Sequence, residues 1–420
     1  SSPAAASAAG SAPGSAAAGR AVKVGLVEAM TGPTANLGID NKDGFNLYLA
    51  SKNNQLAGRT IDVHQVDTGG QADSALTKVR QLVDNDGVDL LVGVSNSQEC
   101  YAGAPYVRTA QIPWLLTGQC GSPDLTLSPK YASPYLTRWT YSAAEQIDPA
   151  SDWAYKQGYK QVDLITTDYV GGLQVADFFG SGYVRAGGTV IQELHPPVNT
   201  VDWGTYVSQL NDGADAIAAF ATGTDGLRFM DAYSTYAGKK KPVLDISTGI
   251  SSGPNIAQLK DKALGLVSFS VYSEDLQTPA NQTFLKAWTA KYPDRIVSVD
   301  AAFGWVAGQI LDAALAKVNG DVSNKQAFLN AVYALNVDSA RGPIKLDSYH
   351  DVIQNAYANQ VVKKGDSYGF KLTDTYPDRG QLTGRTADEL LKFPFGTMKG
   401  QWVGMTKDKR AQALAKALAS

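Results

Sequence analysis

The strongest constraint on the fold is a repeated alternation of short apolar runs with stretches of helical length. An apolar run at 22–28 is followed by a Gly/Pro turn and by a periodic stretch at 40–54, and further apolar runs stand at 88–94, 162–167 and 215–221. Strands that alternate with helices form parallel sheets with right-handed crossovers. Runs that are apolar throughout are typical of sheets covered by helices on both faces. The sequence therefore predicts an α/β fold with doubly wound parallel sheets.

The length of the chain predicts two lobes. A single hydrophobic core stops growing at roughly 250 to 300 residues, and this chain has 420 residues. Hydrophobic residues make up 44% and charged residues 18%, as in an ordinary globular protein. The net charge is only −3 and there is no block of Lys or Arg, so the composition argues against a nucleic-acid partner. No run reaches the ~18 apolar residues of a membrane span.

The first 20 residues predict a flexible tether. They consist of Ser, Ala, Gly, Pro and one Arg, with no large apolar side chain before Val22. Such a segment cannot offset its ordering entropy by burial. Two origins remain open: a natural tether between a lipid-modified terminal Cys and an exported domain, or an artificial linker. The absence of an initiator Met and of an apolar signal region indicates a mature or trimmed chain.

Loops rich in Gly, Ser, Thr, Asn and Gln follow the predicted strands. Ligands of parallel sheets bind outside the carboxyl ends of the strands, and these loops suit a polar small molecule held through backbone groups and hydroxyls. At Asp168, Asp225 and Asp245, which also stand at strand ends, turn and capping roles are favoured over ligand contact. The loops lie at 31–38, 95–100, 117–123, 168–172, 222–226 and 247–253.

Catalytic and cofactor motifs are missing from the sequence. The three histidines, His64, His195 and His350, have no metal-ligand spacing to one another or to a Cys. There is no GxSxG turn, no P-loop and no GxGxxG after a strand. No pair of carboxylates stands out. We therefore expect no catalytic residue, no metal and no cofactor, and we expect that the protein is not an enzyme.

The two cysteines, Cys100 and Cys120, follow successive predicted strands. An even pair in an exported protein favours a disulfide. Two buried free thiols are the alternative, and a catalytic Cys is disfavoured because no His accompanies these loops.

Several segments in a fixed order resemble the type I periplasmic binding proteins, specifically the branched-chain amino acid (Leu/Ile/Val)-binding family. The resemblance covers roughly residues 23 to 377. It implies an extracytoplasmic solute-binding protein, periplasmic or at the cell surface and lipid-anchored, that closes on a small molecule and delivers it to an ABC permease as a monomer. A receptor domain that uses the same clamp for signalling is the alternative. The segments are VKVGLVEAMTGPTANLG, GVSNSQECYAGAPYVRTAQIPWLLTGQCGSPDLT, YLTRWTYSAAEQ, ITTDYVGGLQVADFF, VDWGTYVSQLNDGADAI, ALGLVSFSVYS and GPIKLDSYHDVIQNAYANQVV.

The family's architecture implies two lobes joined by a three-stranded hinge. We expect the chain to cross between the lobes near Tyr141, Tyr272 and Gly342. A C-terminal extension lies beyond the family pattern, with an aromatic loop followed by a helix, and we expect it to pack on a lobe. The predicted division is 21–141 with 273–341 for lobe 1, 142–272 with 342–380 for lobe 2, and 381–420 for the extension.

The resemblance also implies the ligand-binding residues. The family holds the carboxylate of its ligand through a hydroxyl and backbone amides, and these positions fall on Asn96, Ser97, Gln119, Cys120 and Gly121. Backbone amides at helix N-termini are suited to an anion.

In the second lobe the family's stacking tyrosine falls on Tyr169, for which ordinary loop packing is the alternative. Thr248 stands where amino-acid-binding members have an acidic residue, and Thr222 and Leu37 replace aromatic residues. A buried ammonium without a carboxylate partner is costly, so we expect the ligand to be other than a simple α-amino acid. The candidates are an aromatic or other carboxylate, an amide, or a branched-chain amino acid-like molecule. Four further aromatic residues line the pocket or pack in the core: Tyr101, Trp114, Trp139 and Tyr141.

Overall fold

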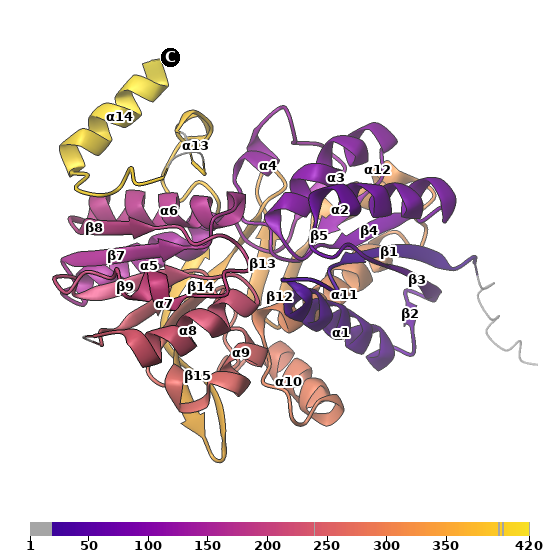
Figure 1. Cartoon of the computed structure of the whole chain (residues 1–420). Helices are drawn as coiled ribbons and strands as arrows, with labels where there is room; N and C mark the ends of the chain where they lie inside the picture. The colour runs from indigo at the N-terminus through magenta and orange to yellow at the C-terminus, as the bar shows by residue number, and fades with distance from the viewer. Residues whose placement is uncertain (1–18, 239, 394, 397–398, 420) are drawn as a thin grey trace, which may run out of the picture.

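Two α/β lobes lie side by side, with the C-terminal segment on the outer side of one of them (Figure 1). The computed structural model describes residues 19–238, 240–393, 395–396 and 399–419. The predicted tether therefore lies outside the described residues except for its last two.

The first lobe contains a six-stranded sheet in the order β2-β3-β1-β4-β5-β6. All neighbouring strands are parallel except β2 and β3, which confirms the predicted alternation of parallel strands and helices. The strands are β1 (Val22–Glu28), β2 (Gln55–Leu56), β3 (Arg59–Asp67), β4 (Leu90–Gly93), β5 (Trp114–Leu116) and β6 (Leu136–Arg138). The helices are α1 (Ala35–Ser51), α2 (Ala72–Arg80) with a π-helical turn (Gln81–Asn85), α3 (Ser97–Ala110), α4 (Asp124–Leu127), α10 (Pro279–Lys291), α11 (Val299–Lys317) and α12 (Lys325–Tyr333).

The helices α1 and α11 pack against each other unusually closely because glycines face each other's backbone. A Cβ on Gly304 would lie 1.8 Å from the carbonyl oxygen of Asn41, and a Cβ on Gly44 would lie 2.0 Å from that of Ala301. Among the described helices, α11 is the one whose length and hydropathy would suit a membrane span. It is instead a core helix here, with Trp305 and Ile310 buried in the first lobe.

The second lobe contains a nine-stranded sheet in the order β12-β13-β14-β11-β10-β9-β7-β8, with β15 paired to β14. The strands from β7 to β11 pair in parallel, whereas β12 to β15 pair antiparallel. Its strands are β7 (Gln161–Thr166), β8 (Thr189–Leu194), β9 (Ala216–Phe220), β10 (Val243–Asp245), β11 (Val267–Ser270), β12 (Asn336–Ser339), β13 (Gly342–Leu346), β14 (Val352–Lys364) and β15 (Ser367–Arg379). Its helices are α5 (Ala143–Lys156), α6 (Val170–Ala186), α7 (Gly204–Val207), α8 (Thr224–Tyr236) and α9 (Gly253–Leu259), followed by a 3₁₀ turn (Lys260–Ala263).

The second sheet is mixed, because its C-terminal strands pair antiparallel. Lys364 of β14 pairs with Ser367 of β15, so that Gly365 and Asp366 form a two-residue loop. Gly365 has φ +60, in the left-handed region that such tight hairpins require. A two-residue loop can only join antiparallel strands, and the mixed sheet follows from it.

Hydrophobic packing locates the three passages between the lobes. Tyr141 belongs to the core of the first lobe and Ala143 to that of the second, so the first passage lies between them. Phe269 packs in the second lobe and Val271 in the first, which marks the return.

Near Gly342, where the third passage was expected, the sheet and the cores overlap. The strands β12 and β13 belong to the sheet of the second lobe. The side chains of Ile344 and Val352 nevertheless pack in the core of the first lobe, and Ala358 of β14 packs in that of the second.

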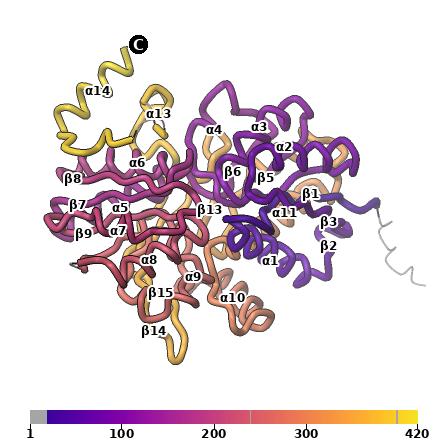
Figure 2. The backbone as a smooth tube through the Cα atoms, viewed as in Figure 1, coloured from indigo at the N-terminus to yellow at the C-terminus, as the bar shows by residue number. Residues whose placement is uncertain are grey.

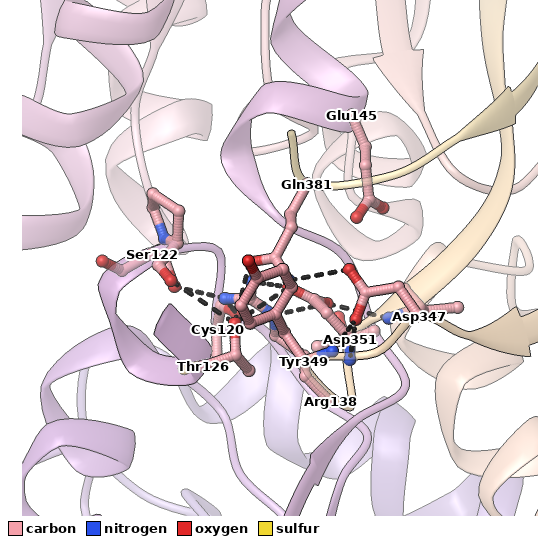
Figure 3. A network of polar contacts seen from close by, with 12 residues as sticks. Cys120, Ser122, Thr126, Arg138, Glu145, Asp347, Tyr349, Asp351 and Gln381 are labelled. Atoms are coloured by element: carbon pink, nitrogen blue, oxygen red, sulfur yellow. Dashed lines mark hydrogen bonds and ion pairs between the residues drawn. The ribbon is translucent and has the colours of Figure 1, made fainter. Parts of the chain in front are cut away.

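A buried ion pair lies beside these passages (Figure 3). Arg138, at the end of β6, donates through Nε to Asp351 Oδ1 at 2.9 Å, and its Nη2 forms a second contact with the same carboxylate. Both side chains are fully buried. Arg138 also donates to the carbonyl oxygens of Cys120 and Ser122. The Arg138 guanidinium therefore binds both Asp351, just before β14, and the loop after β5.

The C-terminal extension packs along α6 of the second lobe (Figure 2) and contains the helices α13 (Ala387–Lys392) and α14 (Lys407–Ala419). Trp402 is fully buried, and its Nε1 donates to Asp177 Oδ1 of α6 at 2.8 Å. A Cβ on Gly180 would lie 2.3 Å from this indole, so the glycine allows the ring to lie on the helix. Arg385 donates to both oxygens of buried Asp148 on α5 at 2.6 and 2.8 Å. The extension thus supplies the partners of two buried carboxylates.

Candidate ligand-binding site

A small cavity lies between the lobes. All six polar loops predicted from the sequence contribute to its wall, because the carboxyl ends of the parallel strands in both lobes face each other there. None of the lining residues has a charged side chain. They are Leu37, Ser95, Asn96, Ser97, Gln119, Gly121, Tyr141, Ala143, Tyr169, Gly171, Gln174, Val175, Phe220, Thr222, Ser247, Thr248 and Gly249.

The first turns of three long helices face the cavity. Ser97 begins α3, Ala143 begins α5, and Gly171 is the second residue of α6. The N-terminus of a helix has a partial positive charge and unsatisfied N–H groups. These helix ends can therefore supply N–H donors to the cavity, although its lining contains no cationic side chain.

In the Ser-rich loop, Ser97 and Asn96 have different roles. The backbone N–H groups of Ser95 and Asn96 donate to Glu99 Oε2 at 3.0 and 2.9 Å, and the Asn96 side chain accepts from the N–H of Glu99 to complete a capping box. Asn96 lines the cavity, but its side chain and its backbone N–H already form hydrogen bonds that stabilise the first turn of α3. Ser97 is the residue of this loop whose hydroxyl is left for a ligand.

A relay of hydrogen bonds orients Gln119 on the wall of the first lobe. Tyr141 Oη donates to Gln119 Oε1 at 2.6 Å, and Gln119 Nε2 donates to Asp300 Oδ1 at 2.9 Å. Burial raises the pKa of Asp300 to about 8, so this carboxyl is protonated at neutral pH. The relay therefore keeps a polar but uncharged surface behind the cavity.

Cys120, one of the residues predicted for the ligand site, is not part of the cavity wall. Its side chain is buried in the first lobe and is joined in a disulfide to Cys100, with the Cα atoms 6.5 Å apart. Gln119 and Gly121, on either side of it, line the cavity while Cys120 faces the core, because successive residues of an extended segment point in opposite directions. The disulfide links α3 to the loop after β5, the two segments of the first lobe that supply Ser97 and Gln119.

Aromatic rings form much of the wall on the second lobe. Tyr169 and Phe220 stack with ring centroids 6.5 Å apart and planes at 28°. A Cβ on Gly171 would lie 2.7 Å from the ring of Tyr169, so this glycine leaves room for the tyrosine at the start of α6. Leu37, Thr222 and Thr248 also lie on the wall, as the sequence suggested.

Direct hydrogen bonds cross between the lobes beside the cavity. Gln174 Nε2 of α6 donates to Tyr101 Oη at 3.0 Å and to Ser122 Oγ at 2.9 Å in the first lobe. Asn36 Nδ2 donates to Ser252 Oγ at 3.4 Å. The two lobes are therefore in direct contact beside the cavity.

The other candidates from the sequence have structural roles. Asp168 pairs with Lys399, Asp225 accepts from the N–H of Asn199 at 2.8 Å, and Asp245 accepts from those of Ile250 and Ser251. Trp114 and Trp139 are buried in the core. Of the four aromatic residues that were considered for the pocket, Tyr141 lines it. Within the described residues no group of His, Cys, Asp and Glu side chains is arranged to hold a metal ion.

Sequence reasoning missed Gln174, Val175 and Phe220. Phe220 is the last residue of a strand, and Gln174 lies one helical turn after Gly171, so neither belongs to a polar loop. Gln174 follows Gly171 by three residues, and residues three or four apart lie on the same face of a helix. This spacing could have indicated that Gln174 lies near the cavity.

Two α/β lobes that line one cavity from both sides define a clamp-type ligand-binding protein. The model of the periplasmic binding protein family matches residues 21–366. The chain therefore belongs to the periplasmic binding protein family, as its sequence motifs indicated.

Three relatives illustrate the range of similarity. The Leu/Ile/Val-binding protein homolog 6 of Brucella melitensis biotype 1 is 26% identical over 367 residues, which are 86% of this chain and 92% of that protein. The structure of an ABC transporter substrate-binding protein from Sphaerobacter thermophilus is 30% identical with a TM-score of 0.80, covering 87% of this chain and 100% of that chain. The structure of a solute-binding protein of an ABC transporter from R. palustris in complex with benzoate is 26% identical with a TM-score of 0.78, covering 85% and 98%.

Proposed function

We propose that this protein is the extracytoplasmic solute-binding component of an ABC importer and that its ligand is a small aromatic carboxylate. The single observation that carries the ligand class is the cavity itself, which has no charged side chain in its wall but has three helix N-termini facing it. Backbone N–H groups at helix N-termini bind anions without the help of a cationic side chain. The carboxylate would lie against Ser97 and the first turn of α3.

The same electrostatics disfavour an α-amino acid. Thr222 and Thr248 stand on the wall of the second lobe, and the lining offers no carboxylate for an ammonium group. A buried ammonium without an ionic partner costs several kcal/mol in lost hydration. The positive ends of the helices would add to this cost.

Three aromatic rings favour a planar ligand. Tyr141 and Tyr169 line the cavity from opposite lobes, and Phe220 stacks behind Tyr169. Aromatic pairs in offset or tilted arrangements gain about 0.5–1.5 kcal/mol beyond the area that they bury. The R. palustris relative whose structure contains benzoate supports this ligand class.

Transport by closure follows from the two-lobed arrangement. A ligand that contacts Ser97 on one lobe and Tyr169 on the other stabilises the closed form, and the closed form would dock on the permease. The protein would act as a monomer, and it would make and break no bond in its ligand. The same proposal includes a lipid anchor attached through a removed N-terminal segment.

The experiment is a calorimetric titration of ligand-depleted protein with benzoate, para-hydroxybenzoate, benzamide and leucine. We expect the two acids to bind and leucine to give no heat. Ser97→Ala and Tyr169→Ala are expected to weaken benzoate binding, whereas Tyr236→Ala, at a side chain that is 62% exposed, serves as a matched control without effect. Tight leucine binding without a response to the acids would overturn the ligand class. Turnover of a bound ligand would overturn the assignment as a transport component.

A further inference from the structure

A second, small cavity lies near the ligand cavity, and Thr248 lines both. Residues of both lobes line it, with Val297 and Val299 from the first lobe and Ser268 from the second. It therefore also lies between the lobes. We call it the hydroxyl chamber.

The wall of the hydroxyl chamber is unusually rich in buried hydroxyl groups. Ser251, Ser268, Ser270, Ser273 and Tyr272 all line it, and none of them is more than 6% exposed. Apolar residues would fill such a space at lower cost, because buried polar groups need hydrogen-bond partners. The composition indicates a chamber built for a polar occupant.

Several of these groups have hydrogen-bonding capacity to spare. The oxygens of Ser270 and Ser273 accept from the backbone N–H groups of Tyr272 and Asp275 at 3.1 and 3.3 Å, which leaves their hydroxyl protons free to be donated. Tyr272 Oη is buried without a partner. Asn359 donates through Nδ2 to the carbonyl oxygen of Tyr272 at 3.0 Å, while its Oδ1 has no partner.

The chamber has no free charge to offer. Glu274 is its one ionic side chain, and its Oε1 already accepts from Lys364 Nζ at 2.6 Å and from the N–H of Phe370 at 2.7 Å. The groups that remain without a hydrogen-bond partner are therefore hydroxyl donors and one amide acceptor. This combination matches a neutral group that both accepts and donates hydrogen bonds.

We propose that the hydroxyl chamber binds the distal polar end, a hydroxyl or an amide, of an elongated ligand whose other end lies in the main cavity. This inference rests on the proposed function, because it assumes a carboxylate anchored beside Ser97. Thr248, with φ +55, stands at the junction of the two spaces. Its side chain is small and uncharged, so the residue between the two spaces adds no charge to either.

The test compares ligands that differ by one distal hydroxyl. Para-hydroxyphenylpropanoate and phenylpropanoate share the carboxylate, the linker and the ring, and benzoate is the short acid. The wild-type protein is expected to prefer the hydroxylated acid by roughly fivefold or more, since a buried group left unpaired is costly. In Tyr272→Phe this preference is expected to fall to about twofold or less, with benzoate affinity unchanged.

Tyr272→Phe is a clean probe because it removes an oxygen that has no partner in the fold. Its thermal stability is expected to equal or exceed that of the wild type, and Tyr236→Phe on the surface is the matched control. Equal affinity of the wild type for both propanoates, or the same preference in Tyr272→Phe, would overturn the chamber's role. A failure of all three acids to bind would instead overturn the proposed ligand class, so the two failures are distinguishable.

Discussion

Replacing Trp402 with alanine tests whether the C-terminal extension is part of the second lobe. The indole is fully buried, lies over Gly180 of α6 and stacks on Phe393 with centroids 5.9 Å apart. Its Nε1 is also one of the donors to Asp177, a carboxylate that is itself buried. The substitution therefore opens a cavity and removes a hydrogen bond at the same point.

The two effects give a large expected loss of stability. Truncation of a buried Trp to Ala costs about 3–5 kcal/mol, and a buried carboxylate that loses a donor adds about 1–3 kcal/mol. A folding unit of 150–250 residues shifts its Tm by roughly 2–4 °C per kcal/mol. We expect the unfolding transition of the second lobe to fall by at least about 8 °C.

Differential scanning calorimetry measures this shift, with two variants as controls. Trp402→Phe keeps much of the packing but loses the hydrogen bond, so its Tm is expected between those of the wild type and Trp402→Ala. Leu418→Ala, at a side chain of α14 that is 37% exposed, is expected to change the Tm little. A Trp402→Ala protein that melts within about 2 °C of the wild type would refute the view that the extension completes the lobe.

Three further predictions concern the first lobe and closure. Mass spectrometry after alkylation without reductant is expected to find no labelled thiol, and labelling of Cys100 and Cys120 would contradict the disulfide. Because burial raises the pKa of Asp300 to about 8, its carboxyl gains a negative charge as pH rises through that value. In titrations from pH 7 to 9 the affinity for benzoate should therefore weaken, while that for a neutral amide that binds should not. The Asp300→Asn variant should not show this pH dependence. If the dependence persists in this variant, ionisation of Asp300 is not its cause. Tyr101→Phe removes a hydroxyl that accepts a hydrogen bond from Gln174 outside the cavity wall. We expect this variant to release its ligand faster and to bind it roughly twofold to tenfold more weakly. An unchanged dissociation rate in stopped-flow measurements would contradict a role of this contact in closure.

The position of the cavity could be predicted because it depends on topology. Parallel strands end at a common edge, so the polar loops after β4 and β7 had to meet across the cleft once two lobes were expected. Leu37, Ser97, Tyr169 and Thr248 were found by this reasoning together with the family motifs. The same reasoning favoured capping and turn roles at Asp225 and Asp245. Asp245 accepts from N–H groups in the loop that follows it, whereas Asp225 accepts from Asn199, 26 residues earlier.

The features that were missed depend on packing between distant segments. The side chain of Cys120 faces the core, and one-residue alternation in an irregular loop cannot be inferred from composition. Gln174 reaches the cavity from within a helix, and its partner Tyr101 lies 73 residues earlier. The extension's attachment through Trp402 and Asp177 joins segments 225 residues apart, and no local pattern specifies such a contact.

The most direct test of the clamp is small-angle X-ray scattering of ligand-depleted protein with and without an aromatic acid. We expect saturating benzoate to reduce the radius of gyration, and leucine at the same concentration to leave it unchanged. A protein that binds benzoate without becoming more compact, or that closes on leucine alone, would contradict the central claim that two lobes close around an aromatic carboxylate.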